Sequence, residues 1–315
     1  MKNTPIWNYR HAILLVATAI GVYANTWSHD YAWDDAIVIT ANERVLAGWD
    51  ALPDLFQNVR ADSPDGRYGY RPLTLITFAT EIELFGRNPR WPHVINTLLY
   101  GLVCLVAWLT LLRLFPSQPN ALLFWIIMLF TLHPVHTEVV ANIKSRDELL
   151  AMLFGLLAVI QYHRYLHAVQ WRSLLLSLVF LLLGFLSKES AIVFAGVFLL
   201  LPWVEASAHK VSRWRGMLPA LGAITLVGFT WWLTQQDAVV IDDAASRFDR
   251  GLYYESSHLG NPLFFSVDGW WEIPANSLVL SVLYLKKFIF PWPLLHDYST
   301  YQVRVTDWGD PLVYF

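Results

Sequence analysis

The stretch HVINTLLYGLVCLVAWLTLLRL, residues 93–114, decides the fold class of this chain. A helix needs about 20 mainly apolar residues to cross a bilayer, and this run reaches that length before it ends at Arg113 and Leu114. Hydrophobic residues make up 56% of the 315 positions, charged residues 15%, and the mean hydropathy is +0.40. A water-soluble domain of this composition would have difficulty staying in solution. We therefore predict an all-α, polytopic helical membrane protein.

Further apolar segments lie on both sides of this run. Residues 11–27 follow Lys2 and Arg10 and lack a small-residue cleavage site, so we predict an uncleaved signal anchor. Residues 121–132 are short for a full crossing. The other apolar segments are residues 147–166, 173–186, 191–204, 217–233 and 276–290. We predict about eight membrane segments in total.

The charges between these segments predict an orientation. Arg164 and Arg172 flank one short connection, and Lys210, Arg213 and Arg215 fill another, as expected of cytoplasmic loops. The outward-facing regions are then residues 28–92, 133–146, 187–190 and 235–274. Residues 28–92 are predicted to form a structured outer loop, with amphipathic helices near residues 50–59 and 72–85 that lie along the membrane surface. We predict two domains, a transmembrane core at 1–234 and a second domain, residues 235–315, with an outer loop and the final membrane segment.

Two adjacent carboxylates, Asp34 and Asp35, follow the first apolar segment. Acids close to lipid are costly to dehydrate and repel each other, so such a pair is typical of a functional site. The alternative is a solvated loop in which an aspartate caps a short helix at Ala36. The pair is the first candidate for catalysis.

Cations occur in two other outward segments. Arg71 precedes Pro72, and because proline suits the first position of a helix, this arginine stands where a helix begins. Lys188 and Glu189 lie between two apolar segments, where charges are costly unless they pair or line a wet cavity. Arg71 and Lys188 are therefore candidates for binding a phosphate group. Arg71 could instead extend to the lipid headgroups.

Two histidines and a glutamate, His133, His136 and Glu138, follow residues 121–132. A zinc-protease helix carries histidines at positions i and i+4, and the spacing of His133 and His136 does not supply that face. These side chains could hydrogen-bond a substrate or the acidic pair. The alternative is a helix that is capped at Thr137.

These patterns also limit the cofactors and partners. We expect that no cofactor is required, and the alternative is a divalent metal bound by Asp34, Asp35, His136 and Glu138. The single cysteine, Cys104, excludes an intrachain disulfide. A net charge of −3 and the lack of a basic patch with interleaved aromatics argue against nucleic-acid binding.

The polar motifs follow one another in a recognisable order. They are Trp33-Asp34-Asp35-Ala36-Ile37, Tyr70-Arg71-Pro72-Leu73-Thr74, His93 with Asn96, His133-Pro134-Val135-His136-Thr137-Glu138, Arg146 with Glu148-Leu149-Leu150, and Lys188-Glu189. This order resembles the transmembrane and tetratricopeptide-repeat-containing O-mannosyltransferases, which are GT-C glycosyltransferases. Residues 261–299 are similar to the region that follows the core in that family. The resemblance covers nearly the whole chain but includes no tetratricopeptide repeats, so the chain is expected to be either a truncated core or a short relative.

The resemblance implies a hexosyltransferase that moves a sugar, mannose by analogy, from a polyprenyl-phosphate donor to an acceptor hydroxyl on protein. The acid in the first outer loop carries catalysis in the superfamily, and here it maps onto Asp34 or Asp35. Arg71 and Lys188 would stabilise the leaving phosphate, as an inverting transfer requires. The substrate-orienting residues would be His133, His136, Glu138, Arg146 and Glu189.

The same reasoning places the active site on the non-cytoplasmic face of a multi-pass protein. That membrane would be the inner membrane in a bacterium and the endoplasmic reticulum in a eukaryote. Two other classes compete with the enzyme. A transporter or flippase of lipid-linked sugars also needs charge at phosphate depth, although no internal symmetry between the halves is visible. A membrane scaffold without activity would not need the acidic pair, and both acids are present.

Overall fold

The computed structural model describes residues 9–32, 34–56, 70–209 and 273–292, with scattered positions between 216 and 228. Every element within these residues is a helix, which confirms the all-α prediction for the described part of the chain. The chain divides into two compact units, Met1–Ala238 and Val239–Phe315. The predicted segment at 217–233 and the loop at 235–274 lie almost wholly outside the described residues.

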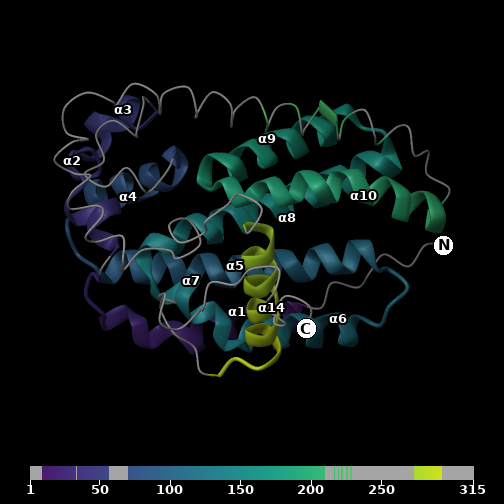
Figure 1. Ribbon diagram of the computed structural model, residues 1–315, viewed down its shortest axis with the longest axis horizontal. Coiled ribbons are helices and arrows are strands. Elements are labelled where there is room, and N and C mark those ends of the chain that lie inside the picture. The colour runs from purple at the N-terminus through teal and green to yellow at the C-terminus, as the bar shows by residue number, and fades with distance from the viewer. Residues whose placement is uncertain are drawn as a thin grey trace. The chain divides into compact units, whose positions relative to one another are not determined.

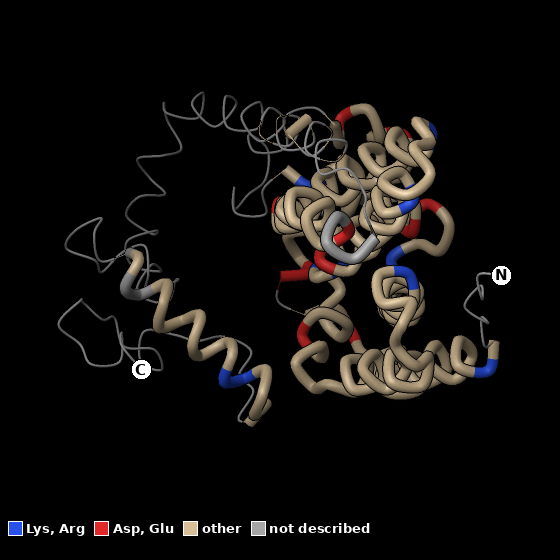
Figure 2. The backbone as a smooth tube through the Cα atoms, turned by 90° about the vertical axis from the view of Figure 1, so that its right-hand side faces the viewer, with Lys and Arg blue, Asp and Glu red and all other residues tan. Residues whose placement is uncertain are grey.

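The first unit is built on six helices that lie alongside one another (Figure 1). These are α1 (Tyr9–Tyr23), α5 (Arg90–Leu114), α6 (Asn120–Leu132), α8 (Arg146–Ala168), α9 (Trp171–Ser187) and α10 (Ile192–His209). Each of them contains or closely overlaps an apolar segment predicted from the sequence. Charged residues occupy little of their length, as the mostly tan tube of the backbone shows (Figure 2).

Some of these helices have the length and composition of a full membrane crossing, and others are shorter. Arg90–Leu114 and Ile143–Ala168 are long and apolar enough. Helix α6 and the segment Pro134–Ala141 pass together as a third, although they are bent by 50° at the break between them. The described residues therefore contain two or three candidate spans by length and composition, and they do not by themselves show the predicted set of about eight membrane segments, several of which were expected to be shorter than a full crossing. Helices such as the 15-residue α1 are indeed shorter than a bilayer is thick.

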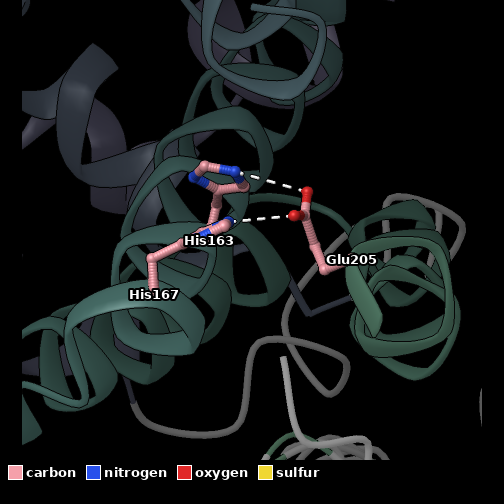
Figure 3. Close-up of side chains that lie close together, drawn as sticks. All are labelled: His163, His167 and Glu205. Carbon is pink, nitrogen blue, oxygen red and sulfur yellow. Dashed lines mark hydrogen bonds and ion pairs between the residues drawn. The ribbon is translucent and has the colours of Figure 1, made fainter. Parts of the chain in front are cut away.

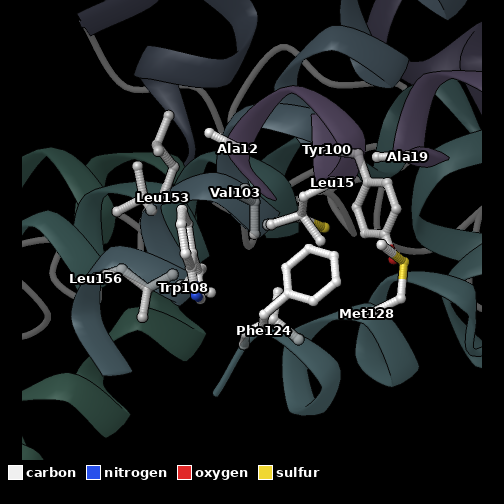
Figure 4. Close-up of a cluster of buried hydrophobic side chains, with 14 of the residues drawn as sticks. Ala12, Leu15, Ala19, Tyr100, Val103, Trp108, Phe124, Met128, Leu153 and Leu156 are labelled. Atoms are coloured by element: carbon white, nitrogen blue, oxygen red, sulfur yellow. The ribbon is translucent and has the colours of Figure 1, made fainter. Parts of the chain in front are cut away.

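Helices α1, α5, α6 and α8 meet in the largest apolar core of this unit (Figure 4). Leu15 of α1 and Trp108 of α5 are fully buried in it, beside Phe124 of α6. The ring of His11 stacks on Phe124 with ring centroids 4.4 Å apart. Close van der Waals packing of this kind is what holds helices together in a bilayer, so this core joins the four helices.

The described residues of the predicted outer loop form short helices that gather at one end of the long helices (Figure 1). Helix α4 spans Pro72–Phe85, as predicted, with proline at its first position and Gly86 in a positive-φ conformation directly after it. The other short elements are the π-helix η2 (Ala36–Thr40), α2 (Glu43–Leu46), the 3-10 turn η3 (Gly48–Ala51) and α3 (Leu52–Phe56). Buried Val38, Phe78 and Ile143 join these elements into a second small core.

Three further short elements connect the long helices. They are the 3-10 turn η4 (Pro134–His136), helix α7 (Thr137–Ala141) and the 3-10 turn η5 (Ile143–Ser145), while η6 (Glu189–Ala191) joins α9 to α10. In the second unit the structure describes α14 (Ile273–Ile289), which overlaps the predicted final segment 276–290. The rest of residues 235–315 lies outside the described part.

Candidate functional site

Three segments that the sequence predicts to face outward contact one short stretch of the chain, residues 144–148, through charged side chains. They are the turn that precedes η2, the start of α4 and the η6 turn, and each contacts the segment from η5 into α8. The segment that begins α8 is thus common to all of them. Residues of the candidate site that are far apart in the sequence are brought together at this end of α8.

The two aspartates of the first loop lie in different environments. Asp35 is buried, and its carboxylate accepts hydrogen bonds from the backbone N–H groups of Ala32 (2.9 Å) and Lys144 (3.0 Å). Burial raises the pKa of Asp35, although these two bonds favour its charged form. The side chain of Asp34 is 43% exposed, and its carboxylate lies 3.0 Å from the ammonium of Lys144. Asp34 is therefore the acid that a substrate can reach, while Asp35 fixes the loop against η5.

Arg71 is held by two carboxylates. One terminal nitrogen of its guanidinium donates to Asp147 at 2.5 Å, and the other donates to Glu189 at 2.8 Å. Its Nε adds a third bond, to Glu189 at 3.2 Å. Burial raises the pKa of Glu189, but the hydrogen bonds and the charge of Arg71 outweigh this effect and leave the pKa below its usual range. Arg71 thereby ties the start of α4 to α8 and to η6.

Lys188 binds the same acidic end of α8. Its ammonium lies 3.3 Å from Asp147 and 2.9 Å from Glu148. Three carboxylates, with Glu189 the third, thus surround the two cations Arg71 and Lys188. Asp147 has no exposed side-chain surface, whereas the side chains of Glu148 and Glu189 are 40% and 55% exposed. An anionic ligand can therefore reach these cations by displacing the two exposed glutamates and leaving Asp147 in place.

Arg146 is placed differently from the prediction that it orients a substrate. Its side chain is completely buried, and the guanidinium pairs with both carboxylate oxygens of Glu81. It also donates to Asn96 Oδ1 at 2.7 Å, Thr77 Oγ1 at 3.1 Å and the carbonyl of Pro92 at 3.1 Å. All five donors of an arginine are engaged by these contacts. Arg146 therefore holds α4, α5 and α8 together, and its effect on a substrate can only be indirect.

The residues predicted in the third motif do not all lie in this network. His133 Nδ1 accepts from the backbone N–H of Val135 and so caps η4, while the ring of His136 packs on Phe130 with centroids 4.2 Å apart. Glu138 is exposed. Within the described residues, no three of the alternative metal ligands Asp34, Asp35, His136 and Glu138 bring their ligand atoms together.

Three residues that organise the site are not among the candidates predicted from the sequence, namely Glu81, Lys144 and Asp147. Acids in the first turn of a helix are favoured by the helix dipole, and Asp147 with Glu148 at the start of an apolar run fits that pattern. That signal could have identified Asp147. The pairing of Glu81 with Arg146 joins residues 65 positions apart, which no local pattern reveals.

The protein is thus a helical protein of membrane type, with an accessible aspartate close to a group of paired cations and acids. Sequence comparison adds the family. The chain is 33% identical over 221 residues to Protein O-mannosyl-transferase TMTC1 of Homo sapiens, which covers 66% of this chain and 25% of that protein. It is 33% identical over 183 residues to Protein O-mannosyl-transferase Tmtc1 of Drosophila melanogaster, which covers 56% of this chain and 21% of that protein. Protein O-mannosyl-transferase TMTC3 of Mus musculus is 27% identical to it over 237 residues, which covers 70% of this chain and 25% of that protein.

The chain is therefore a homologue of the protein O-mannosyl-transferases, which confirms the family resemblance of its ordered motifs. It spans about a quarter of the length of these relatives, and the similarity extends over a smaller part of this chain than the motifs suggested. No family model matches the chain, and no solved structure matches it.

Proposed function

We propose that this chain forms the membrane-embedded catalytic core of a mannosyltransferase. The enzyme moves mannose from a polyprenyl-phosphate donor to a hydroxyl of a protein acceptor, with inversion at the anomeric carbon. The reaction takes place on the non-cytoplasmic face of a GT-C-like fold with about eight membrane segments. The membrane is the inner membrane in a bacterium and the endoplasmic reticulum in a eukaryote.

The observation that carries this proposal is the meeting of Asp34, Arg71 and Lys188 through the start of α8. The relatives, which are named as protein O-mannosyl-transferases, support mannose as the sugar and a protein as the acceptor. A lipid-linked donor suits a site beside apolar helices, because its polyprenyl chain remains in the bilayer while its phosphate and sugar reach the polar loops.

Asp34 acts as the general base. It takes the proton of the acceptor hydroxyl, the oxygen of that hydroxyl bonds to the anomeric carbon, and the bond from this carbon to the phosphate oxygen breaks. The ammonium of Lys144, 3.0 Å away, orients the carboxylate of Asp34. Asp35 keeps the loop in position through its two backbone hydrogen bonds. The exposure of Asp34 and the burial of Asp35 support this division of roles.

Arg71 and Lys188 stabilise the polyprenyl phosphate as it leaves. Because both cations are already paired, the donor phosphate enters by replacing the carboxylates of Glu189 and Glu148, the two exposed partners. Both the carboxylate contacts and the phosphate contacts are charge-assisted, so the exchange replaces strong bonds by bonds of the same kind, and the displaced side chains of Glu189 and Glu148 are already partly in water. Asp147 stays behind as the buried anchor that keeps both cations aligned.

The acceptor and the sugar contact the remaining groups near this network. His133, His136 and Glu138 are proposed to orient the acceptor chain as it approaches Asp34. Catalysis needs no divalent metal, since Asp34 abstracts the proton unaided and the leaving phosphate is neutralised by protein cations.

The experiment that tests the proposal uses the purified full chain in detergent with radiolabelled polyprenyl-phosphate-mannose and an acceptor peptide rich in serine and threonine. Labelled peptide and released polyprenyl phosphate in equal amounts are the expected result. The same chain reconstituted in vesicles distinguishes the proposed transferase from a flippase of lipid-linked sugars. Movement of intact labelled donor across the bilayer, without release of polyprenyl phosphate, would identify a flippase and overturn the proposal.

A further inference from the structure

A second group of polar side chains lies between helices α8 and α10, outside the network described above (Figure 3). His163 and His167 project from α8 and Glu205 projects from α10. The Nε2 atom of His163 lies 3.3 Å from Oε1 of Glu205, and the Nε2 atom of His167 lies 2.9 Å from Oε2. One carboxylate thus faces two imidazoles, one on each of its oxygens.

The positions of these residues follow from helix geometry. His163 and His167 are four residues apart, so they lie on one face of α8, one above the other. This is the i, i+4 spacing that His133 and His136 lack. Glu205 belongs to another helix and has a side chain that is only 3% exposed. A carboxylate so deeply buried is stabilised by nearby cations, and a metal ion held by the two imidazoles would be one of them.

The three ligand atoms already lie close to the arrangement that a metal requires. All of them are within 4.8 Å of one another, and in the described part of the chain this is the group of three potential ligands that converges in this way. Around a tetrahedral zinc ion, with bonds of about 2.0–2.2 Å, ligand atoms are about 3.3 Å apart. Side-chain movements of about 1 Å or less would therefore complete the site.

The cluster is well separated from the proposed catalytic site. His163 follows Asp147 by sixteen positions in α8, which corresponds to about 24 Å along a helix. The side chains of His163 and His167 are 15% and 35% exposed, so an ion can enter from the side of the histidines. The carboxylate meanwhile rests at the edge of the apolar cluster that includes Leu166 and Leu201.

We propose that His163, His167 and Glu205 bind a single Zn²⁺ ion, with a water molecule as the fourth ligand. Two imidazoles and one carboxylate form a donor set that zinc accepts in proteins. The ion links α8 to α10 across the end of their apolar contact, far from the reacting groups. Its role is to fix these helices together, because the distance along α8 excludes contact with the substrate at Asp34.

The test measures the metal directly on the full chain in detergent. The protein is stripped with a chelator, incubated with Zn²⁺, passed through a desalting column and analysed by mass spectrometry for elements. We expect about one zinc ion per chain in the wild type and less than about 0.1 in His163→Ala and His167→Ala. Glu205→Gln should bind zinc at least tenfold more weakly. His29→Ala, which removes an exposed histidine of the first loop, is the matched control and should retain the ion.

Cobalt provides a readout of the ligand geometry. Co²⁺ bound to the stripped wild type should give the intense visible absorption of a four-coordinate site, and this absorption should be absent from His167→Ala. Circular dichroism confirms that each variant is folded, and His167, the most exposed of the three, is the substitution least expected to disturb folding. Zinc binding that is equal in the wild type and in all three variants would overturn the proposal. Failure of the folded wild type to bind zinc would also overturn it.

Discussion

Substitution of Glu81 should destabilise this fold more than any other change of a single acid in the outer loop. Glu81 and Arg146 form a salt bridge in which the side-chain exposures are 8% and 0%. Removing one partner of a buried pair leaves the other charge without compensation and typically costs about 3–5 kcal/mol. Asn96, Thr77 and Pro92 still accept hydrogen bonds from Arg146. We therefore expect Glu81→Ala to lower the free energy of unfolding by about 3 kcal/mol, at the lower end of that range.

The assay is denaturant unfolding in a mild detergent, followed by tryptophan fluorescence. Glu83→Ala is the matched control, since Glu83 lies two residues further along α4 and is exposed, and it should change stability by less than about 1 kcal/mol. The double variant Glu81→Leu with Arg146→Met should recover part of the loss, because no charge is then left buried. Equal effects of Glu81→Ala and Glu83→Ala would refute the assignment of Arg146 as a buried structural anchor.

Three other predictions follow from the charged network. The pKa of Glu189 is lowered in the folded protein, so its pairing with Arg71 stabilises the fold at pH values above the ordinary carboxyl pKa of about 4.3. This stabilisation is lost as the pH falls through the lower pKa of the folded state. The stabilities of wild type and Glu189→Gln should therefore converge in an acid titration, and a widening difference would contradict this. Lys188→Gln should weaken donor binding by about 1.5–3 kcal/mol, or roughly 10- to 150-fold, without a comparable change for the acceptor peptide, and unchanged donor affinity would remove Lys188 from the phosphate site. The Glu205→Gln variant, in which the proposed zinc site is already disabled, should keep its turnover when a chelator is added. Loss of turnover in the chelator that a single added metal restores would instead point to Asp34, Asp35 and their neighbours as metal ligands.

The sequence predicted those parts of the fold that depend on local composition. Helix α4 begins at Pro72 and ends at Phe85 as expected, because proline favours the first helical position and Gly86 terminates the helix. The apolar run 93–114 lies within α5 for the same kind of reason. Hydropathy identified these apolar helices but not how many of them cross the membrane in full, since several are shorter than a crossing.

The site was predicted less completely, because its geometry depends on contacts between distant segments. Arg71 and Lys188 lie together because both contact Asp147, but their carboxylate partners on α8 were not foreseen. Arg146 was assigned to the substrate on the strength of its motif, whereas its burial against Glu81 makes it structural. The group of His163, His167 and Glu205 was not predicted, because the two histidines fall inside an apolar helix. Glu205 lies 38 residues beyond His167, on another helix.

The central claim is that Asp34 is the base of a sugar transfer. The most direct measurement compares the rates of mannose transfer by wild type, Asp34→Asn and Asp35→Asn, with donor binding measured in parallel. Asp34→Asn is nearly isosteric and should bind the donor normally yet turn over at least about 100-fold more slowly, as loss of a general base commonly causes. Asp35→Asn should affect stability more than chemistry, since its carboxylate is buried and holds two backbone N–H groups. Transfer by Asp34→Asn at the wild-type rate would contradict the account.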